Sequence, residues 1–141
     1  MSSQKTPKIL VAIDINTFSD KGLKAAIKYA KFMNAEITGV NVVEVRATLA
    51  STVINYKKFL TGKAEKFLDS INKKCEKEGV KFNSKILYGK PSTEISKFAD
   101  QKKFDLIVIG ARGLTGLKSA IMGSTSNGIV HKSKTSVLVI K

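Results

Sequence analysis

The glycines between positions 110 and 123 form the most distinctive chemical pattern in this sequence. Gly110-Ala111-Arg112-Gly113 directly follows an apolar run at residues 105–109, which predicts a buried strand. Gly123 comes next, and the hydroxyl-rich residues 124–127 are typical of a helix amino terminus. Glycines let a backbone approach an anion closely, and a helix amino terminus offers N–H groups and a positive dipole end. The pattern therefore predicts a phosphate site, and through it a nucleotide site.

Other nucleotide-binding and catalytic motifs are missing from the sequence. The P-loop signature is absent, and the turn after the first predicted strand, residues 14–19, lacks the glycines of a dinucleotide fingerprint. Cys75 and His131 are the only residues of their types, so no Cys/His cluster has metal-ligand spacing. We expect Cys75 to be a small core residue in a reducing compartment and His131 to lie at a helix end. The sequence thus predicts no catalytic residue and no metal ligand.

The elements that must position the glycine loop follow from hydrophobic periodicity. Apolar runs at 8–14, 36–43, 80–87, 104–109 and 137–140 predict five strands. One helix is expected to begin at Ser19 or Asp20 and to stop at Asn34, another to begin near Pro91, and a short one to span 124–131. Residues 44–51 are predicted to form a loop. After them comes a long helix that ends near Gly79 and shares one apolar face among Leu60, Ala64, Phe67, Leu68, Ile71 and Cys75.

Strands that are almost continuously apolar and alternate with helices are typical of a parallel sheet covered on both faces. Right-handed crossovers make such a sheet doubly wound, and ligands bind beyond the carboxyl ends of its strands, where the strand order reverses. Asp14 follows the first predicted strand, and the glycine loop follows the fourth. If these two strands are neighbours, both features face the same crevice.

Composition limits the class of protein. A chain of 141 residues that is 43% hydrophobic fits one domain over residues 1–141, with residues 1–6 as a frayed tail. No apolar run approaches the roughly 20 residues of a membrane span, so we expect a cytoplasmic protein without a membrane partner. The net charge of +14 raises nucleic acid as a partner. However, the lysines alternate with acids along the chain, and Arg46 and Arg112 are the only arginines, so a solvated surface is favoured over nucleic-acid binding.

The spacing Gly110-x2-Gly113-x9-Gly123-Ser124 resembles the adenine-nucleotide motif of the universal stress protein family. Residues 8–14 look like the family's first strand and its aspartate, residues 105–113 like its fourth strand and loop, and residues 123–127 and 137–140 like its closing segments. The resemblance implies an α/β three-layer sandwich of the Rossmann-like or flavodoxin-like kind. Its five parallel strands would have the order 3-2-1-4-5, with helices on both faces. It also implies a homodimer that pairs the strand Val137–Ile140 of two copies.

The ATP-binding branch of the family implies roles at the matching positions. The adenine and ribose would lie against Ala12, Ile13, Asp14, Val42, Ile109 and Gly110. The phosphates would be held by the backbone and hydroxyl groups of Gly113, Gly123, Ser124, Thr125 and Ser126, and Arg112 and Lys118 would add positive charge. The implied cofactor is ATP with Mg²⁺ or Mn²⁺.

These features predict a nucleotide-dependent switch or sensor in a stress response, recognised by a partner protein. We do not expect an enzyme, because phosphoryl transfer needs a positioned metal and a basic or water-orienting group, and the sequence identifies neither. Slow hydrolysis stays open, as does the choice among ATP, AMP and a cyclic nucleotide. Two alternative functions also stay open: a hydrolase or transferase acting on adenine nucleotides, and a basic nucleic-acid-binding protein.

Overall fold

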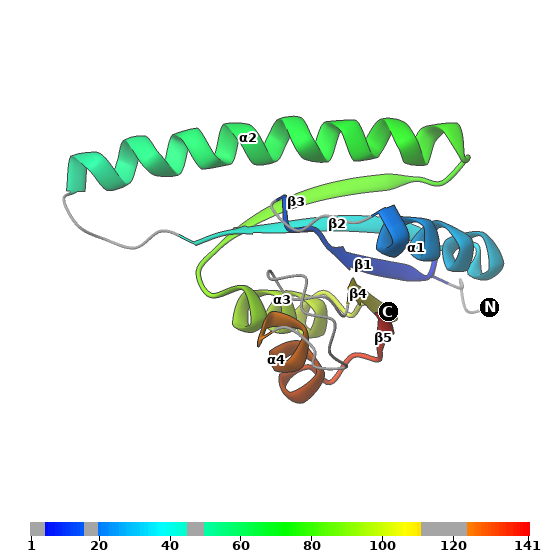
Figure 1. The fold of residues 1–141 in the computed structure, drawn as a ribbon. Helices are drawn as coiled ribbons and strands as arrows, with labels where there is room; N and C mark the ends of the chain where they lie inside the picture. Colours follow the sequence, from blue (N-terminus) through cyan, green and yellow to red (C-terminus); the bar gives the residue numbers. More distant parts are fainter. Residues whose placement is uncertain (1–4, 16–19, 45–49, 111–123) are drawn as a thin grey trace.

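A five-stranded parallel sheet forms the centre of the computed structural model, which describes residues 5–15, 20–44, 50–110 and 124–141. The strand order is β3-β2-β1-β4-β5, and every neighbouring pair is parallel. This confirms the predicted Rossmann-like α/β fold (Figure 1). Its elements are, in chain order, β1 (Lys8–Ala12), α1 (Asp20–Met33), β2 (Glu36–Val43), α2 (Ala50–Lys77), β3 (Phe82–Tyr88), α3 (Pro91–Gln101), β4 (Leu106–Gly110), α4 (Ser124–Lys132) and β5 (Val137–Ile140).

Local sequence signals explain where most helices begin and end. Asp20 occupies the first turn of α1, where its charge favours the helix dipole, and Asn34 ends that helix in a left-handed conformation with φ of 53°. Gly79, with φ of 74°, likewise adopts a left-handed conformation just after the end of α2, and Pro91 is the first residue of α3. The helix α2 already includes Ala50, so it begins before the predicted end of the loop at 44–51, and residues 45–49 lie outside the described ranges.

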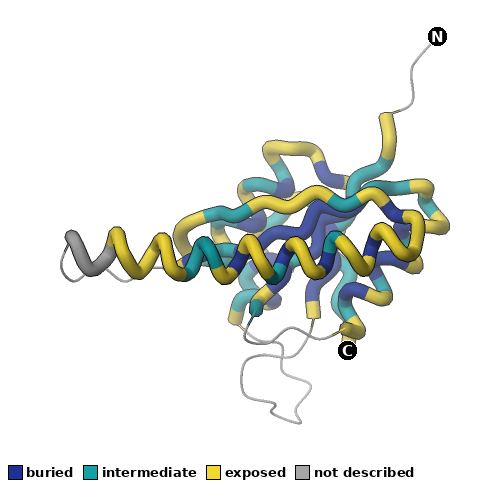
Figure 2. Tube along the Cα trace, turned by 90° about the horizontal axis from the view of Figure 1, so that it is seen from above, coloured by how far each residue is buried: buried dark blue, intermediate teal, exposed yellow. Residues whose placement is uncertain are grey.

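Two hydrophobic clusters lie on opposite faces of the sheet. The helices α1 and α2 cover one face, and α3 and α4 cover the other (Figure 1). Consecutive residues of β1 point to different sides, so Ile9 and Val11 join the first cluster and Leu10 joins the second. Figure 2 shows the buried strands beneath α2, whose surface away from the sheet is exposed. The predicted inner face of α2 is confirmed, with Ala64, Leu68, Ile71 and Cys75 buried and Leu60 and Phe67 partly buried.

Gly39, in the middle of β2, allows two side chains from neighbouring strands to meet above it. An ideal Cβ added to Gly39 would lie 2.5 Å from Cζ of Phe82 and 2.7 Å from Cδ1 of Ile13. Real Cβ atoms do not approach other atoms so closely, so any larger residue would displace one of these two side chains. The ring of Phe82 on the edge strand thus packs across β2 toward the end of β1.

None of the helices in the described part of the chain combines the length and the apolarity that crossing a bilayer requires. The long helix α2 illustrates why, because it carries lysines throughout its length.

Candidate functional site

The carboxyl ends of β1 and β4 lie side by side at one edge of the sheet. The two strands pair in parallel, with Leu10 opposite Ile107 and Val11 opposite Val108. The chain therefore leaves β1 toward Asp14 at the same edge where β4 ends in Gly110. The strand order also reverses here, since β2 lies on one side of β1 and β4 on the other. The predicted neighbourhood of these two strands is confirmed, and the edge is where doubly wound sheets bind ligands.

Two hydrogen bonds fix the path of the chain just beyond β1. The backbone N–H of Ile13 donates to the carbonyl of Val40 at 2.8 Å, and Nδ2 of Asn41 donates to the carbonyl of Ile13 at 2.8 Å. Asn41 is buried in β2, while Asp14 is exposed. The amide of Asn41 thus holds the segment from which Asp14 projects. Our sequence analysis missed Asn41, although a single amide inside the apolar run of β2 is the signal that could have identified it.

The first turn of α4 is tied to the end of β4. Oγ of the buried Ser126 donates to the carbonyl of Gly110 at 2.6 Å. The sequence analysis placed Ser126 against phosphate, whereas here its hydroxyl proton is used to join two elements of the fold. Gly110 itself is exposed, and a Cβ added to it would meet no described atom within 4 Å. Within the described residues, no side chain covers the edge at Gly110.

The other predicted site residues fall into two described groups and one group outside the described ranges. Ala12, Val42 and Ile109 belong to the hydrophobic cluster on the α3 and α4 face, with Ile109 buried and the other two partly buried. Ser124 is exposed and Thr125 half-buried in the first turn of α4, near Gly110. The remaining predicted residues fall outside the described ranges and stay predictions: Arg112, Gly113, Lys118 and Gly123.

The position of α4 depends on close contact with α3. A Cβ added to Gly128 would lie 2.6 Å from Cβ and 2.8 Å from Oγ of Ser92, so only glycine fits there without movement. Nζ of Lys132 donates to Oγ of Ser92 at 3.3 Å and to Oγ1 of Thr93 at 3.0 Å. These contacts fix the position of α4 relative to α3, and therefore the position of the α4 amino terminus at the edge of the sheet.

Asp100, at the end of α3, holds the turn between α4 and β5. Its carboxylate accepts hydrogen bonds from the hydroxyls of Ser133 and Thr135 at 2.9 and 2.8 Å, and from the backbone N–H groups of Lys134 and Thr135. Burial alone would raise the pKa of Asp100, but these hydrogen bonds outweigh it and hold the pKa below its usual value. The turn therefore relies on an ionised carboxylate.

The polar groups described at this edge are the Asp14 carboxylate, the hydroxyls of Ser124 and Thr125, and the backbone amides of the α4 amino terminus. A carboxylate accepts hydrogen bonds from sugar hydroxyls or amines, while hydroxyls and helix amides bind phosphate oxygens. Within the described residues, no group of three or more His, Cys, Asp or Glu side chains could hold a metal ion. The arrangement is chemically suited to binding a phosphorylated sugar.

A parallel sheet of order 3-2-1-4-5, with its open edge between β1 and β4, defines a Rossmann-like α/β protein. The sequence matches the universal stress protein family over residues 5–141, and the chain belongs to that family. It is 33% identical to universal stress protein MJ0531 of Methanocaldococcus jannaschii over 95% of this chain and 81% of the relative. It is 32% identical to universal stress protein YxiE of Bacillus subtilis over 95% of this chain and 98% of the relative.

Solved structures of the family share the fold. UspA of Lactobacillus plantarum superposes with a TM-score of 0.86 at 24% identity, over 99% of this chain and 100% of that protein. A universal stress protein of Archaeoglobus fulgidus in complex with dAMP has a TM-score of 0.71 at 24% identity, over 97% of this chain and 98% of that protein. Another universal stress protein, in complex with cAMP, has a TM-score of 0.74 at 22% identity, over 96% of this chain and 97% of that protein. At these identities the likeness establishes the fold.

Proposed function

We propose that residues 1–141 form one ATP-binding universal stress protein domain that acts as a nucleotide-dependent switch in the cytoplasm and is not primarily an enzyme. Adenine and ribose would lie against the ends of β1, β2 and β4, at Ala12, Ile13, Asp14, Val42, Ile109 and Gly110. The phosphates would lie toward the amino terminus of α4, at Ser124 and Thr125, and toward Arg112, Gly113 and Gly123, with Mg²⁺ or Mn²⁺. Binding would change a surface that a partner protein recognises.

The observation that carries this proposal is the bond between Ser126 and Gly110. It brings the amino terminus of α4 to the end of β4, beside the segment that carries Asp14. A helix amino terminus attracts phosphate, whereas a carboxylate repels it and accepts hydrogen bonds from ribose hydroxyls. The two ends of a nucleotide therefore have different partners at one edge. The family members that bind dAMP and cAMP support an adenine nucleotide as the ligand.

Calorimetric titration with ATP and Mg²⁺ tests the site, using Gly110→Val as the variant. A Cβ at position 110 meets no described atom within 4 Å, so valine fits against the described residues and adds bulk at the edge where the nucleotide would lie. Gly62→Val is the matched control, because a Cβ there also meets no described atom within 4 Å and α2 packs mainly against β2 and β3. We expect micromolar binding by the wild type and the control, and a loss of at least about tenfold in the variant, or about 1.4 kcal/mol. A folded wild-type protein that does not bind ATP would refute the proposal.

We further propose a homodimer through β5, whose outer edge has no neighbouring strand in the described chain. All its side chains, Val137 to Ile140, are only partly buried although each is apolar. The backbone N–H of Ile107 donates to the carbonyl of Ser136. Because the backbone N–H and C=O groups of successive strand residues point to alternate sides, those of Leu138 point toward β4 and those of Val139 point toward the outer edge. Such an open apolar edge favours pairing with a second copy.

Val139→Pro tests the dimer because it removes an outward N–H and leaves the bonds to β4 in place. Light scattering should show a dimer for the wild type and a monomer for this variant. Val139→Ala is the control, since it shortens the same side chain but keeps the N–H. A wild-type monomer, or a proline variant that remains a dimer, would contradict pairing through this edge.

A further inference from the structure

The lysines of α1 lie along one side of the helix. Lys21, Lys24, Lys28 and Lys31 follow one another at intervals of three or four residues, which places them on one side of an α-helix. All of them are exposed, and Asp20 is the only acidic residue in α1. This lysine row extends along the whole helix.

The long helix α2 separates its charges in a similar way. Glu65 and Asp69 line a cavity of about 160 Å³ beside β3, together with Phe82, Ser84 and Ile86. At 100° per residue, a second row of exposed lysines lies roughly a third of a turn from these acids. It consists of Lys63, Lys66, Lys74 and Lys77. The side of α2 with this second row carries no acidic residue, whereas Lys58 and Lys73 lie on the side of the acids, with Nζ of Lys73 3.8 Å from Oδ2 of Asp69.

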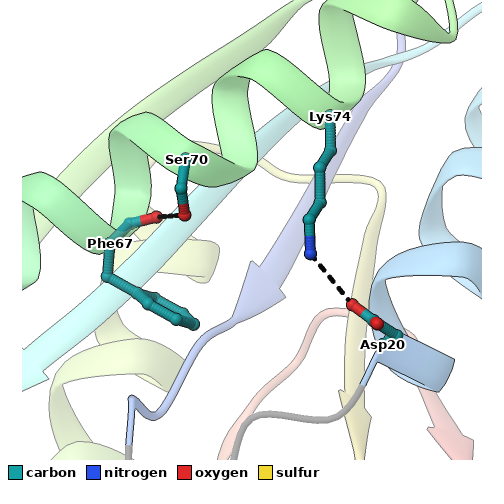
Figure 3. A network of polar contacts seen from close by, with 4 residues as sticks. All are labelled: Asp20, Phe67, Ser70 and Lys74. Carbon is teal, nitrogen blue, oxygen red and sulfur yellow. Dashed lines mark hydrogen bonds and ion pairs between the residues drawn. The ribbon is translucent and has the colours of Figure 1, made fainter.

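Two ion pairs show that the lysine rows of α1 and α2 border each other. Nζ of Lys74 reaches Oδ1 of Asp20 at 3.2 Å across the space between the helices (Figure 3). Nζ of Lys31 contacts Oε1 of Glu78 at 2.6 Å, a hydrogen bond that lowers the pKa of this carboxyl. The acidic groups between the rows are therefore engaged by lysine. We call the two rows together the lysine track.

Exposed aromatic rings lie beside the lysine track. Tyr56 and Phe59 are 50% and 60% exposed, and helical spacing places them on the Lys63 side of α2. Nζ of Lys63 lies 5.5 Å from the centroid of the Phe59 ring. On α1, Phe32 is 73% exposed and directly follows Lys31. Large exposed rings are costly in a soluble protein, and Tyr56 and Phe59, about one helical turn apart, indicate a binding surface at that end of α2.

The distribution of these groups selects the chemical class of partner. From Tyr56 to Lys77 the side of α2 is about 30 Å long at 1.5 Å per residue, enough to follow several phosphates of a strand. Lysine rows neutralise phosphates without selecting a sequence, and exposed aromatic rings stack on unpaired bases. A second copy of this chain docked on this surface would place one lysine row against another and be repelled there. We propose that the lysine track and its aromatic rings bind single-stranded nucleic acid without sequence preference.

Fluorescence anisotropy with a labelled oligothymidylate of about 20 nucleotides, long enough for one such surface, tests this proposal. The variant Lys28→Glu/Lys66→Glu reverses one lysine in each row. The control Lys97→Glu/Lys134→Glu makes the same change of net charge at exposed positions on α3 and in the turn before β5. We expect binding by the wild type that weakens steeply between about 50 and 200 mM salt, and a loss on the order of tenfold or more in the track variant only. An equal loss in the control, or no binding by the folded wild type, would overturn the proposal.

The aromatic part has its own variant and its own competitors. Phe59→Ala should weaken binding about fivefold or more, as expected when one base loses its stacking partner, and should leave the salt dependence unchanged. Unchanged affinity of Phe59→Ala would overturn the stacking role. Equal affinity for duplex DNA or for vesicles of anionic lipid would overturn the assignment to single strands. ATP is left out of these titrations, so their outcome does not depend on the nucleotide site.

Discussion

Replacing Gly128 by alanine should destabilise the protein, whereas the same replacement at Gly62 should stabilise it. Both glycines lie inside helices, where alanine is favoured over glycine by about 1 kcal/mol. At Gly62 a Cβ would meet nothing within 4 Å, so this gain is retained in full. At Gly128 the new Cβ would lie 2.6 Å from Cβ of Ser92, and the two helices must separate. Overpacking of this kind costs about 2–3 kcal/mol, which leaves a net loss of about 1–2 kcal/mol.

The difference between the two variants is large enough for a thermal melt. Their free energies of unfolding should differ by about 2–3 kcal/mol, which corresponds to roughly 4–12 °C in Tm for a domain of this size. The double variant Gly128→Ala/Ser92→Gly removes the atom that the new Cβ would meet and should recover most of the loss, measured against Ser92→Gly alone. If Gly128→Ala raises Tm as much as Gly62→Ala does, the contact between α3 and α4 does not constrain this position and our reasoning is wrong.

Three further outcomes are expected from contacts described above. Because its hydrogen bonds depress the pKa of Asp100, the stability that its carboxylate contributes is complete above the unfolded pKa of about 3.9 and is lost as pH falls through the lower folded pKa. The difference in free energy of unfolding between wild type and Asp100→Asn, measured in urea, should therefore be constant near pH 6 and shrink as pH falls below about 3.9. Burial, aided by the charge of Glu78, raises the pKa of the Cys75 thiol to about 11, so an aromatic disulfide reagent at about pH 8 should react with Cys75 only after denaturant is added. Asn41→Leu leaves the Ile13 carbonyl without its donor and should cost about 1–3 kcal/mol in chemical denaturation, while Asn41→Gln should not restore the loss if the 2.8 Å geometry is required.

Periodicity predicted the fold because the elements here are locally consistent. The apolar runs at 36–43 and 137–140 became β2 and β5 with the same bounds, and Asn34 and Pro91 mark a helix end and a helix start as predicted. The strand order was implied by the resemblance of the motif to the family, while the alternation of strands and helices predicted the parallel sheet. The start of α2 was placed too late, since Ala50 and Ser51 lack the apolar spacing on which a helix prediction depends.

Contacts between distant segments were beyond the reach of the sequence. The bond of Ser126 to Gly110 joins residues 16 positions apart, and a hydroxyl at a helix start is equally suited to phosphate or to a carbonyl. The approach of Gly128 to Ser92 depends on how two helices pack, which no local pattern encodes. The side of α2 that carries lysines without acids was accessible from the sequence, but finding it required a helical projection of residues that alternate in sign along the chain.

The missing side chain of Gly39 has a consequence for how this protein varies among its relatives. Because the ring of Phe82 and the side chain of Ile13 fill the space above Gly39, these three positions share one fixed volume. A relative with alanine or serine at the first position must carry a smaller residue at one of the other two, and substitutions there should be inherited together. Since Ile13 immediately precedes Asp14, a change of Phe82 on the outermost strand would also shift the segment that carries Asp14. The outer strand at Phe82 and the edge that carries Asp14 share no residue, yet substitutions at one are expected to constrain substitutions at the other.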